Sequence, residues 1–312
     1  MIFCKNSYRN LILGLIAMLV FASCKNTDEV AVPSFLHVNA ISVAKPADGP
    51  FASESDGFFT SDINAAYVVA YYPGHSAVDT IGGFQLPFTV PIRYTGQAEY
   101  IEIYPMIKIS GTSGMRGFYP FYSMIVLRDS LMFNELDTLK FDTLKAYYAA
   151  TMDAPLKKEF FEPTQGGIIF DSVVNWVRHD ASAACTGFGC GNVHINADQN
   201  HVDFKMTEKC TGLDPNIVGS KTVYLELDYR GNKRLSVEMT SARERGGNET
   251  TEEIMTINPS DTWKKIYITL GRTWKWFNFN PEFRIVFSVL NAEGTEGDIW
   301  IDNVKIISTS AS

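Results

Sequence analysis

The sequence predicts an all-β fold with two domains in series. The first observation is the length, because 312 residues exceed the roughly 100 to 200 residues of a typical single domain. The second is that short apolar runs recur with a period of two, which is typical of half-buried strands. The third is that the 23 Gly and 13 Pro residues punctuate these runs, as turns between strands require.

The composition narrows the class of protein further. With 46% hydrophobic and 20% charged residues, the chain is neither disordered nor a polytopic membrane protein. The net charge of -8 has the wrong sign for neutralising phosphates, so we expect no nucleic acid partner.

The first 23 residues have the layout of a secretory signal peptide. Lys5 and Arg9 precede an apolar run over residues 11–22, which is too short to span a bilayer. Residues 19–24 resemble a bacterial lipoprotein signal, although Phe21 stands where Leu is commonest. The resemblance implies that Cys24 is lipidated and that acyl chains hold the protein on a membrane. The alternative is an ordinary signal peptide in which Cys24 is incidental.

An acidic linker is predicted over residues 24–34. The stretch 25–29, Lys-Asn-Thr-Asp-Glu, resembles the export signal of Bacteroidota surface lipoproteins. This resemblance implies a lipid-anchored protein of the outer membrane, exposed at the cell surface. The alternative is a plain solvated linker, since runs of charge are commonly solvated.

The first folded domain is predicted over residues 35–125 as a small β-sandwich. Strand-like runs occupy residues 35–43, 65–72, 83–92 and 100–104. The glycine-led segments within residues 82–87 and 94–103 resemble PEGA-like and transthyretin-like modules. Residues 126–158 are predicted to be a β-rich connection, although a helix over 130–150 competes with that interpretation.

The second domain is predicted over residues 159–309. A Phe-Glu opening strand, the runs 263–270 and 283–289, and a closing Ile-Asp-Asn-Val strand resemble jelly-roll carbohydrate-binding modules. The predicted fold class is therefore all-β, with a small N-terminal β-sandwich followed by a C-terminal jelly-roll β-sandwich. The resemblance also implies a structural calcium held by Glu162 and Asp302, although two carboxylates are few for a cation that takes six to eight oxygens. No cofactor is expected to be required.

The period-two alternation predicts which face of each strand of the second domain is buried. We expect the inward residues to be Val223, Leu225, Leu227 and Tyr229; Leu235, Val237 and Met239; Ile266, Ile268 and Leu270; and Phe283, Ile285, Phe287 and Val289. Facing outward with Tyr224 we expect Glu226, Asp228, Glu238, Lys265, Tyr267 and Arg284. This outward face is interpreted either as a glycan-binding groove or as a plain solvated sheet with cross-strand ion pairs.

An aromatic cluster follows the strand 263–270. If that segment is an extended loop, Trp274 and Trp276 point to one side and form a platform on which a sugar ring can stack. The alternative is that these rings cap the end of the core, since large aromatic residues are buried on average.

No motif for catalysis was found, so we expect a protein that is not an enzyme. Glu226 and Asp228 lie about 7 Å apart by strand rise, a separation that glycoside hydrolases also use, but the hydrolase hypothesis is disfavoured. The spacing of Cys185, Cys190, Cys210, His194 and His201 matches no standard zinc site. A Cys185–Cys190 disulfide and free thiols both remain open.

Five tripeptides of Asp, then Ser or Thr, then an aliphatic residue resemble the O-glycosylation acceptors of exported Bacteroidota proteins. The alternative is that these pairs begin turns and strand ends. The acceptor residues are Thr80, Ser130, Thr138, Thr143 and Ser172. We expect modification within residues 129–144, the stretch predicted to join the domains.

Taken together, these patterns predict a lipid-anchored, non-catalytic glycan-binding protein. The alternative is a structural subunit that docks on an outer-membrane protein complex. An exposed aromatic groove on the second domain favours glycan, whereas an apolar patch of several hundred Å² on the first favours a protein partner.

Overall fold

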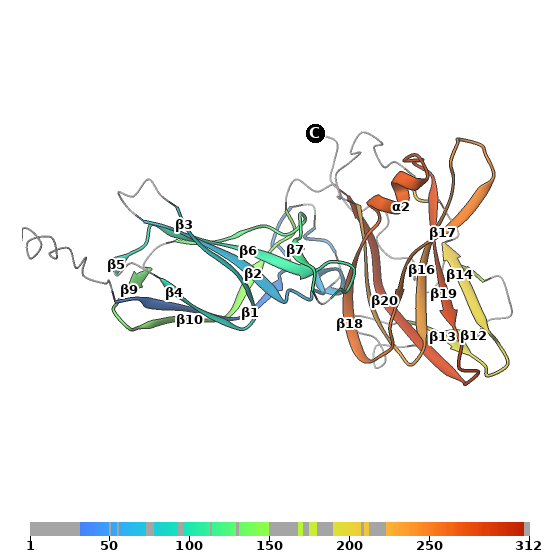
Figure 1. Cartoon of the computed structure of the whole chain (residues 1–312), viewed down its shortest axis with the longest axis horizontal. Helices are drawn as coiled ribbons and strands as arrows, with labels where there is room; N and C mark the ends of the chain where they lie inside the picture. The colour runs from blue at the N-terminus through green and yellow to red at the C-terminus, as the bar shows by residue number, and fades with distance from the viewer. Residues whose placement is uncertain are drawn as a thin grey trace, which may run out of the picture.

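The computed structural model describes residues 32–149, 168–170, 175–179, 190–211 and 223–308, apart from short gaps at 50, 55, 73–77, 93–95, 113, 129–130 and 207–208. It consists of two β-sandwiches in series (Figure 1), which confirms the predicted fold class. In Figure 1 the strands of the first sandwich run along the long axis of the molecule, and those of the second run across it. Across these described ranges, no helix is long and apolar enough to cross a membrane.

The first sandwich packs two main sheets around a core that includes Leu36, Val38, Ile101 and Ile103, all fully buried. Its three-stranded sheet has the order β10 (Thr138–Ala146), β1 (Ser34–Val43), β4 (Phe88–Ile92). The other sheet has the order β3 (Asp79–Gln85), β2 (Ala65–Tyr71), β6 (Tyr100–Lys108), β7 (Arg116–Phe118), with β8 (Ile125–Leu127) also paired to β6. A short pair, β5 (Gly96–Gln97) and β9 (Met132–Phe133), and the 3-10 helix η1 (Asp56–Phe59) complete the domain.

The stretch after residue 125 belongs to this first sandwich. Strand β10 pairs with β1 in parallel over eight residue pairs from Phe35 and Thr138 onward, and β8 pairs with β6. The competing helix interpretation of residues 130–150 is wrong, because Leu144 and Ala146 alternate with exposed residues and fill the core with a period of two. The predicted connection over 126–158 therefore supplies strands of the domain as far as Ala146.

The second sandwich packs two five-stranded antiparallel sheets, and the chain crosses between them several times. One sheet has the order β11 (Ile168–Phe170), β14 (His201–Met206), β19 (Phe283–Leu290), β16 (Arg234–Ala242), β17 (Glu249–Ile257). The other has the order β12 (Asn175–His179), β13 (Cys190–Ile195), β20 (Gly297–Ser308), β15 (Val223–Gly231), β18 (Ser260–Thr269), and α2 (Gly271–Trp276) follows β18. All the residues predicted to face inward on β15, β16, β18 and β19 lie in this core, with Leu270 just after β18.

The two sandwiches contact each other through the outer face of the β15, β18 and β20 sheet. Tyr224 and Tyr267 belong to the hydrophobic core of the first sandwich although they stand on strands of the second. The rings of Tyr119 and Tyr224 lie 5.1 Å apart, centroid to centroid, and those of Tyr119 and Tyr267 lie 5.0 Å apart. The backbone N–H of Ser110 donates to the carbonyl of Tyr267 at 2.8 Å. Through this hydrogen bond, the backbone of the first domain pairs with β18, the edge strand of its sheet in the second domain.

Candidate functional site

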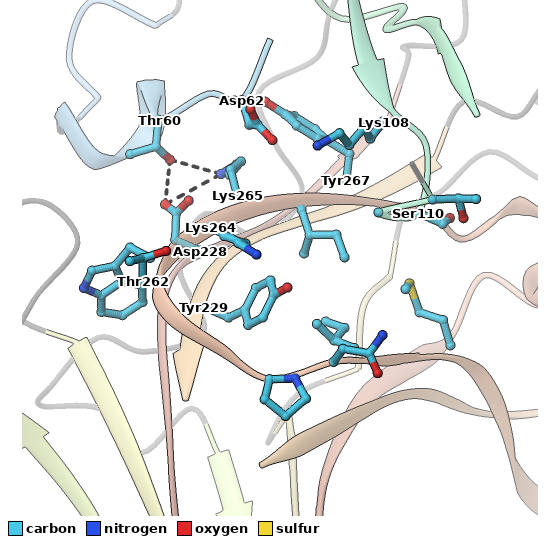
Figure 2. Close-up of a pocket in the computed structure, with 18 of the residues that line it drawn as sticks. Thr60, Asp62, Lys108, Ser110, Asp228, Tyr229, Thr262, Lys264, Lys265 and Tyr267 are labelled. Atoms are coloured by element: carbon cyan, nitrogen blue, oxygen red, sulfur yellow. Dashed lines mark hydrogen bonds and ion pairs between the residues drawn. The ribbon is translucent and has the colours of Figure 1, made fainter. Parts of the chain in front are cut away.

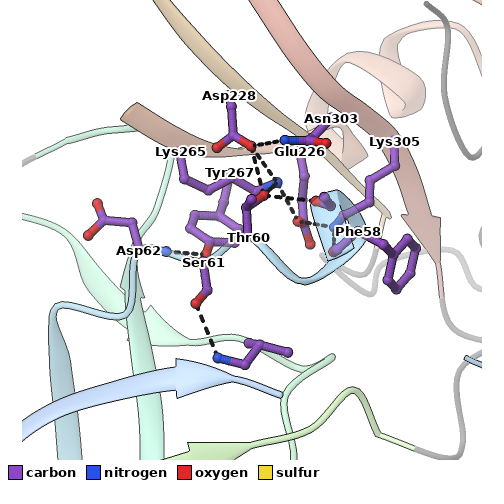
Figure 3. A network of polar contacts seen from close by, with 12 residues as sticks. Phe58, Thr60, Ser61, Asp62, Glu226, Asp228, Lys265, Tyr267, Asn303 and Lys305 are labelled. Atoms are coloured by element: carbon purple, nitrogen blue, oxygen red, sulfur yellow. Dashed lines mark hydrogen bonds and ion pairs between the residues drawn. The ribbon is translucent and has the colours of Figure 1, made fainter. Parts of the chain in front are cut away.

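A buried ionic network lies at this junction (Figure 3). Glu226 on β15 is fully buried, and its Oε2 lies 3.1 Å from Lys305 Nζ and 3.2 Å from Lys265 Nζ. The Tyr119 hydroxyl donates to Glu226 Oε1 at 2.5 Å, and the Tyr148 hydroxyl donates to Oε2 at 3.2 Å. Because both tyrosines come from the first domain, this carboxylate joins the two sandwiches.

Further polar contacts connect the same strands to the segment that follows η1. Thr60 Oγ1 donates to Asp228 Oδ2 at 2.7 Å and accepts from Lys265 Nζ at 3.1 Å. Asn303 Nδ2 donates to the same Asp228 oxygen at 2.7 Å. Lys305 donates to the carbonyl of Phe58 and lies over the Phe58 ring at 4.2 Å. Each buried charge of the network therefore has a partner of opposite charge or a hydrogen bond, as burial requires.

The pKa values of this network follow from its burial and its charge pairs. Burial alone would raise the pKa of Glu226, but the attraction of Lys305 and Lys265 outweighs it and lowers that pKa below 4.5. Burial lowers the pKa of Lys305 to about 8, against the attraction of Glu226. Burial, followed by the charge of Glu226, raises the pKa of Tyr119 well above 10.

This network corrects the predicted outward face. Glu226, Asp228, Lys265 and Tyr267 were expected to face a ligand or solvent, yet all four are at least nine-tenths buried because the first domain covers them. The four side chains form neither an open groove nor a solvated sheet, although Asp228, Lys265 and Tyr267 reach the lining of the cleft described below. Glu238 and Arg284 lie on β16 and β19 of the other sheet and pair elsewhere, through Ser236 and Glu249. The predicted set is therefore divided between two faces.

A cleft of about 1070 Å³ opens beside the network, between the two domains (Figure 2). From the first domain, the segment after η1 lines it with Asp62, and the end of β6 and the loop after it contribute Lys108 and Ser110. From the second domain, the end of β17, the loop that follows it and β18 line it with Trp263, Lys264 and further residues. Hydroxyl, amide and charged groups around one indole ring form a surface that can bind a polyhydroxylated ligand. Its remaining polar lining consists of Thr60, Ser61, Thr112, Asp228, Tyr229, Thr256, Asn258, Thr262, Lys265 and Tyr267.

Next to the cleft, three side chains stack across neighbouring strands. The Arg230 guanidinium on β15 lies 5.2 Å from the Trp263 ring on β18 and 4.8 Å from the Trp300 ring on β20. All three side chains are only partly buried. Trp263 stands two residues before Lys265 on β18, on the same face of the strand as Lys265 and Tyr267. The alternation of the sequence could therefore have predicted that Trp263 belongs to this face.

The structure separates the two tryptophans of the predicted platform. Residues 271–276 form α2 rather than an extended loop, so Trp274 and Trp276 point to opposite sides of a helix. Trp274 is buried, and its Nε1 donates to the carbonyl of Asn280 at 2.7 Å. Trp276 is 52% exposed and lines a second hollow of about 650 Å³ with Arg243, whose guanidinium lies 4.0 Å from the ring. The platform prediction is wrong for Trp274, which caps the core.

Aromatic residues also cover the outer face of β2 and β6 in the first domain. Tyr71 and Tyr100 stack with ring centroids 4.1 Å apart. The hydroxyls of Tyr71 and Tyr104 donate to Glu102 Oε2 at 3.0 and 2.7 Å, and this hydrogen bond raises the pKa of Tyr104 to about 12. Glu102 and the tyrosine hydroxyls make this face mixed rather than apolar.

Five residues of the predicted sites lie outside the described part of the chain. They are Cys24, Ser130, Glu162, Ser172 and Cys185. Cys190 and Cys210 are buried. His194 Nδ1 lies 3.1 Å from Asp298 Oδ1, and His201 Nε2 lies 3.8 Å from Asp203 Oδ2.

The predicted calcium site has one described member, Asp302. Its Oδ1 accepts the backbone N–H of Asn303 at 2.7 Å. The described part of the chain holds no cluster of three or more His, Cys, Asp or Glu side chains suited to a metal. The calcium site stays a prediction.

Three predicted O-glycosylation acceptors can be placed. Thr80, Thr138 and Thr143 are exposed. Thr138 and Thr143 lie on β10, at the edge of a sheet and not between the domains. Their modification stays a prediction.

Comparisons with known proteins return structures but no sequence relatives. No family model matches the chain, and no curated protein matches it. A solved structure from work on the promiscuous specificity of carbohydrate-binding modules from the beta-sandwich superfamily is 11% identical, with a TM-score of 0.36 over 89% of this chain and 99% of the other. A family 11 carbohydrate-binding module from Clostridium thermocellum, in complex with a mixed-linked tetrasaccharide, is 14% identical, with a TM-score of 0.36 over 52% of this chain and 97% of the other. An exo-beta-agarase is 11% identical, with a TM-score of 0.35 over 51% of this chain and 25% of the other. At these values the similarity carries no argument about function.

Proposed function

We propose that this protein is a non-catalytic glycan-binding protein whose site is the cleft between the two sandwiches. The observation that carries the proposal is the cleft itself, about 1070 Å³ in volume and lined by Trp263 and by polar groups of both domains. A pyranose can stack its C–H face on the indole while its hydroxyls reach Asp62, Ser110 and Asn258. The resemblance of the strands over residues 263–307 to carbohydrate-binding modules points to the same class of ligand.

The arrangement of the junction also supports binding in preference to catalysis. Glu226 and Asp228, the carboxylates with a hydrolase-like spacing, accept hydrogen bonds from Tyr119, Thr60 and Asn303 inside the domain junction. Glu226 is also neutralised by two lysines. A carboxylate held ionised in this way is a poor general acid, because that role needs a raised pKa.

A glycan array tests the proposal. The soluble fragment from residue 30 onward contains every described strand and is expected to bind at least one glycan. Trp263→Ala should weaken that binding about tenfold or more, because it removes the stacking surface. Trp276→Ala is the matched control and should leave binding unchanged. Loss of binding in the Trp276 variant alone would move the site to the hollow beside α2, and an array without any bound glycan would contradict the proposed function.

We also propose that the protein is held on the outer membrane, facing the cell surface, by a lipid on Cys24. The lipoprotein-like signal over residues 19–24 and the acidic stretch over residues 25–29 support this. Cys24→Ala should abolish metabolic labelling with palmitate and release the protein from the membrane fraction. Unchanged labelling in that variant would rule out this anchor.

A further inference from the structure

The cleft carries positive charges that the rest of the protein does not neutralise. Lys108 from β6 and Lys264 from β18 both line it, and neither ammonium group has an ion-pair or hydrogen-bond partner in the described part of the chain. Figure 2 shows the two lysines reaching the cleft from elements of different domains. In a chain with a net charge of -8, two unpaired lysines in one hollow are an unusual concentration of positive charge.

The stacked arginine beside the cleft adds a third such charge. Arg230 lies between the rings of Trp263 and Trp300, and no acidic side chain pairs with it among the described residues. Its Nε is buried without a hydrogen-bond partner in the same part of the chain. Two flat rings hold the guanidinium in place, which leaves its other N–H groups for a ligand and keeps the cost of ordering it low.

The remaining charged groups of the cleft do not cancel this excess. Within the buried network the two lysines Lys265 and Lys305 balance the carboxylates of Glu226 and Asp228, with 4.0 Å between Lys265 Nζ and Asp228 Oδ2. Asp62 is the one acidic side chain left in the lining, and its backbone N–H donates to the Tyr267 hydroxyl at 2.8 Å. The accessible lining therefore combines two lysines with one carboxylate, next to an arginine.

From this distribution of charge we infer that the ligand is an acidic glycan, whose carboxylate or sulfate groups contact Lys108, Lys264 and Arg230 while a sugar ring stacks on Trp263. This inference rests on the proposed function, because it names the class of glycan bound at the same cleft. Lysine ammonium groups and the planar arginine fork are the side chains that bind carboxylate and sulfate oxygens. Since the lysines come from different domains, both sandwiches contribute to the recognition.

Paired polysaccharides that differ only in charge test the inference. The full chain, purified in detergent, is titrated with polygalacturonate and its methyl ester, and with a sulfated galactan and its desulfated form. We expect at least tenfold tighter binding to the acidic member of one pair, with an affinity that decreases as salt is added. The pair that shows the difference identifies carboxylate or sulfate as the group bound.

Charge variants assign the effect to the cleft. The double variant Lys108→Gln/Lys264→Gln should lose about tenfold in affinity for the acidic member, whereas Lys140→Gln, an exposed lysine of β10, is the matched control. Asp62→Asn should strengthen binding, because it removes the repelling charge. Equal affinity for charged and neutral members would overturn the inference and leave glycan binding standing. The inference also fails if no acidic polysaccharide binds, and the array then decides the proposed function separately.

Discussion

Glu226→Gln is expected to destabilise the protein by about 3–5 kcal/mol, the largest effect of any single substitution at the junction. The change removes the carboxylate that neutralises Lys305 and Lys265, whose Nζ atoms lie 3.1 and 3.2 Å from Glu226 Oε2. Lys305 is 1% exposed, so water cannot replace the lost partner. Urea unfolding, followed by tyrosine and tryptophan fluorescence, measures the loss.

Two comparisons make this prediction specific. Glu238→Gln, on β16 of the other sheet, should change stability by less than about 1 kcal/mol. The double variant Glu226→Leu/Lys305→Met should recover much of the loss, because it removes the buried charge with its partner. A decrease below about 1 kcal/mol for Glu226→Gln would mean that the first domain does not cover this face.

The same carboxylate gives the junction an expected pH dependence. Folding lowers the pKa of Glu226 below its ordinary 4.5, so its stabilising contribution is complete above that value. The contribution is lost as the pH falls through the folded-state pKa. The Glu226→Gln variant should lack this part of the acid sensitivity.

Trp274→Ala is expected to destabilise the second sandwich by about 3–5 kcal/mol, because it leaves a cavity at the end of the core. The indole is 2% exposed, packs edge-on against Phe279 with ring centroids 5.5 Å apart, and donates its N–H to Asn280. Thermal unfolding monitored by circular dichroism measures the effect.

Its neighbour on α2 provides the control. Trp276 is 52% exposed and contacts the surface through Arg243 and Glu252. Trp276→Ala should therefore cost less than about 1 kcal/mol. Similar losses for both variants would contradict the helical placement of residues 271–276, which sets the two rings on opposite sides.

The alternation of apolar and polar residues predicted much of the fold, because successive side chains of a strand point to opposite faces of the sheet and every second residue faces the core. Val223, Leu225 and Leu227 were placed correctly in this way. The same rule says nothing about what covers the outer face. Tyr224 and Tyr267 on that face are large aromatic residues, and their burial against Tyr119 depends on a contact between segments more than 100 residues apart in the chain.

The candidate site was harder to predict than the fold because it belongs to neither domain alone. Asp62 lies in a loop of the first sandwich and Lys108 at the end of β6, and nothing local in the sequence brings them to Trp263. The helix α2 was missed for a different reason. It is six residues long and contains three aromatic or β-branched residues, so intrinsic propensity does not indicate a helix there.

Amide hydrogen exchange, with and without the glycan that the array identifies, tests the central claim that the ligand lies between the two domains. Binding is predicted to protect residues 60–62 and 108–112 of the first domain together with 256–265 of the second, the segments that line the cleft. Exchange in residues 271–278 should stay unchanged. Protection confined to 243–254 and 271–278, around Trp276, would contradict this account and place the glycan on the second domain alone.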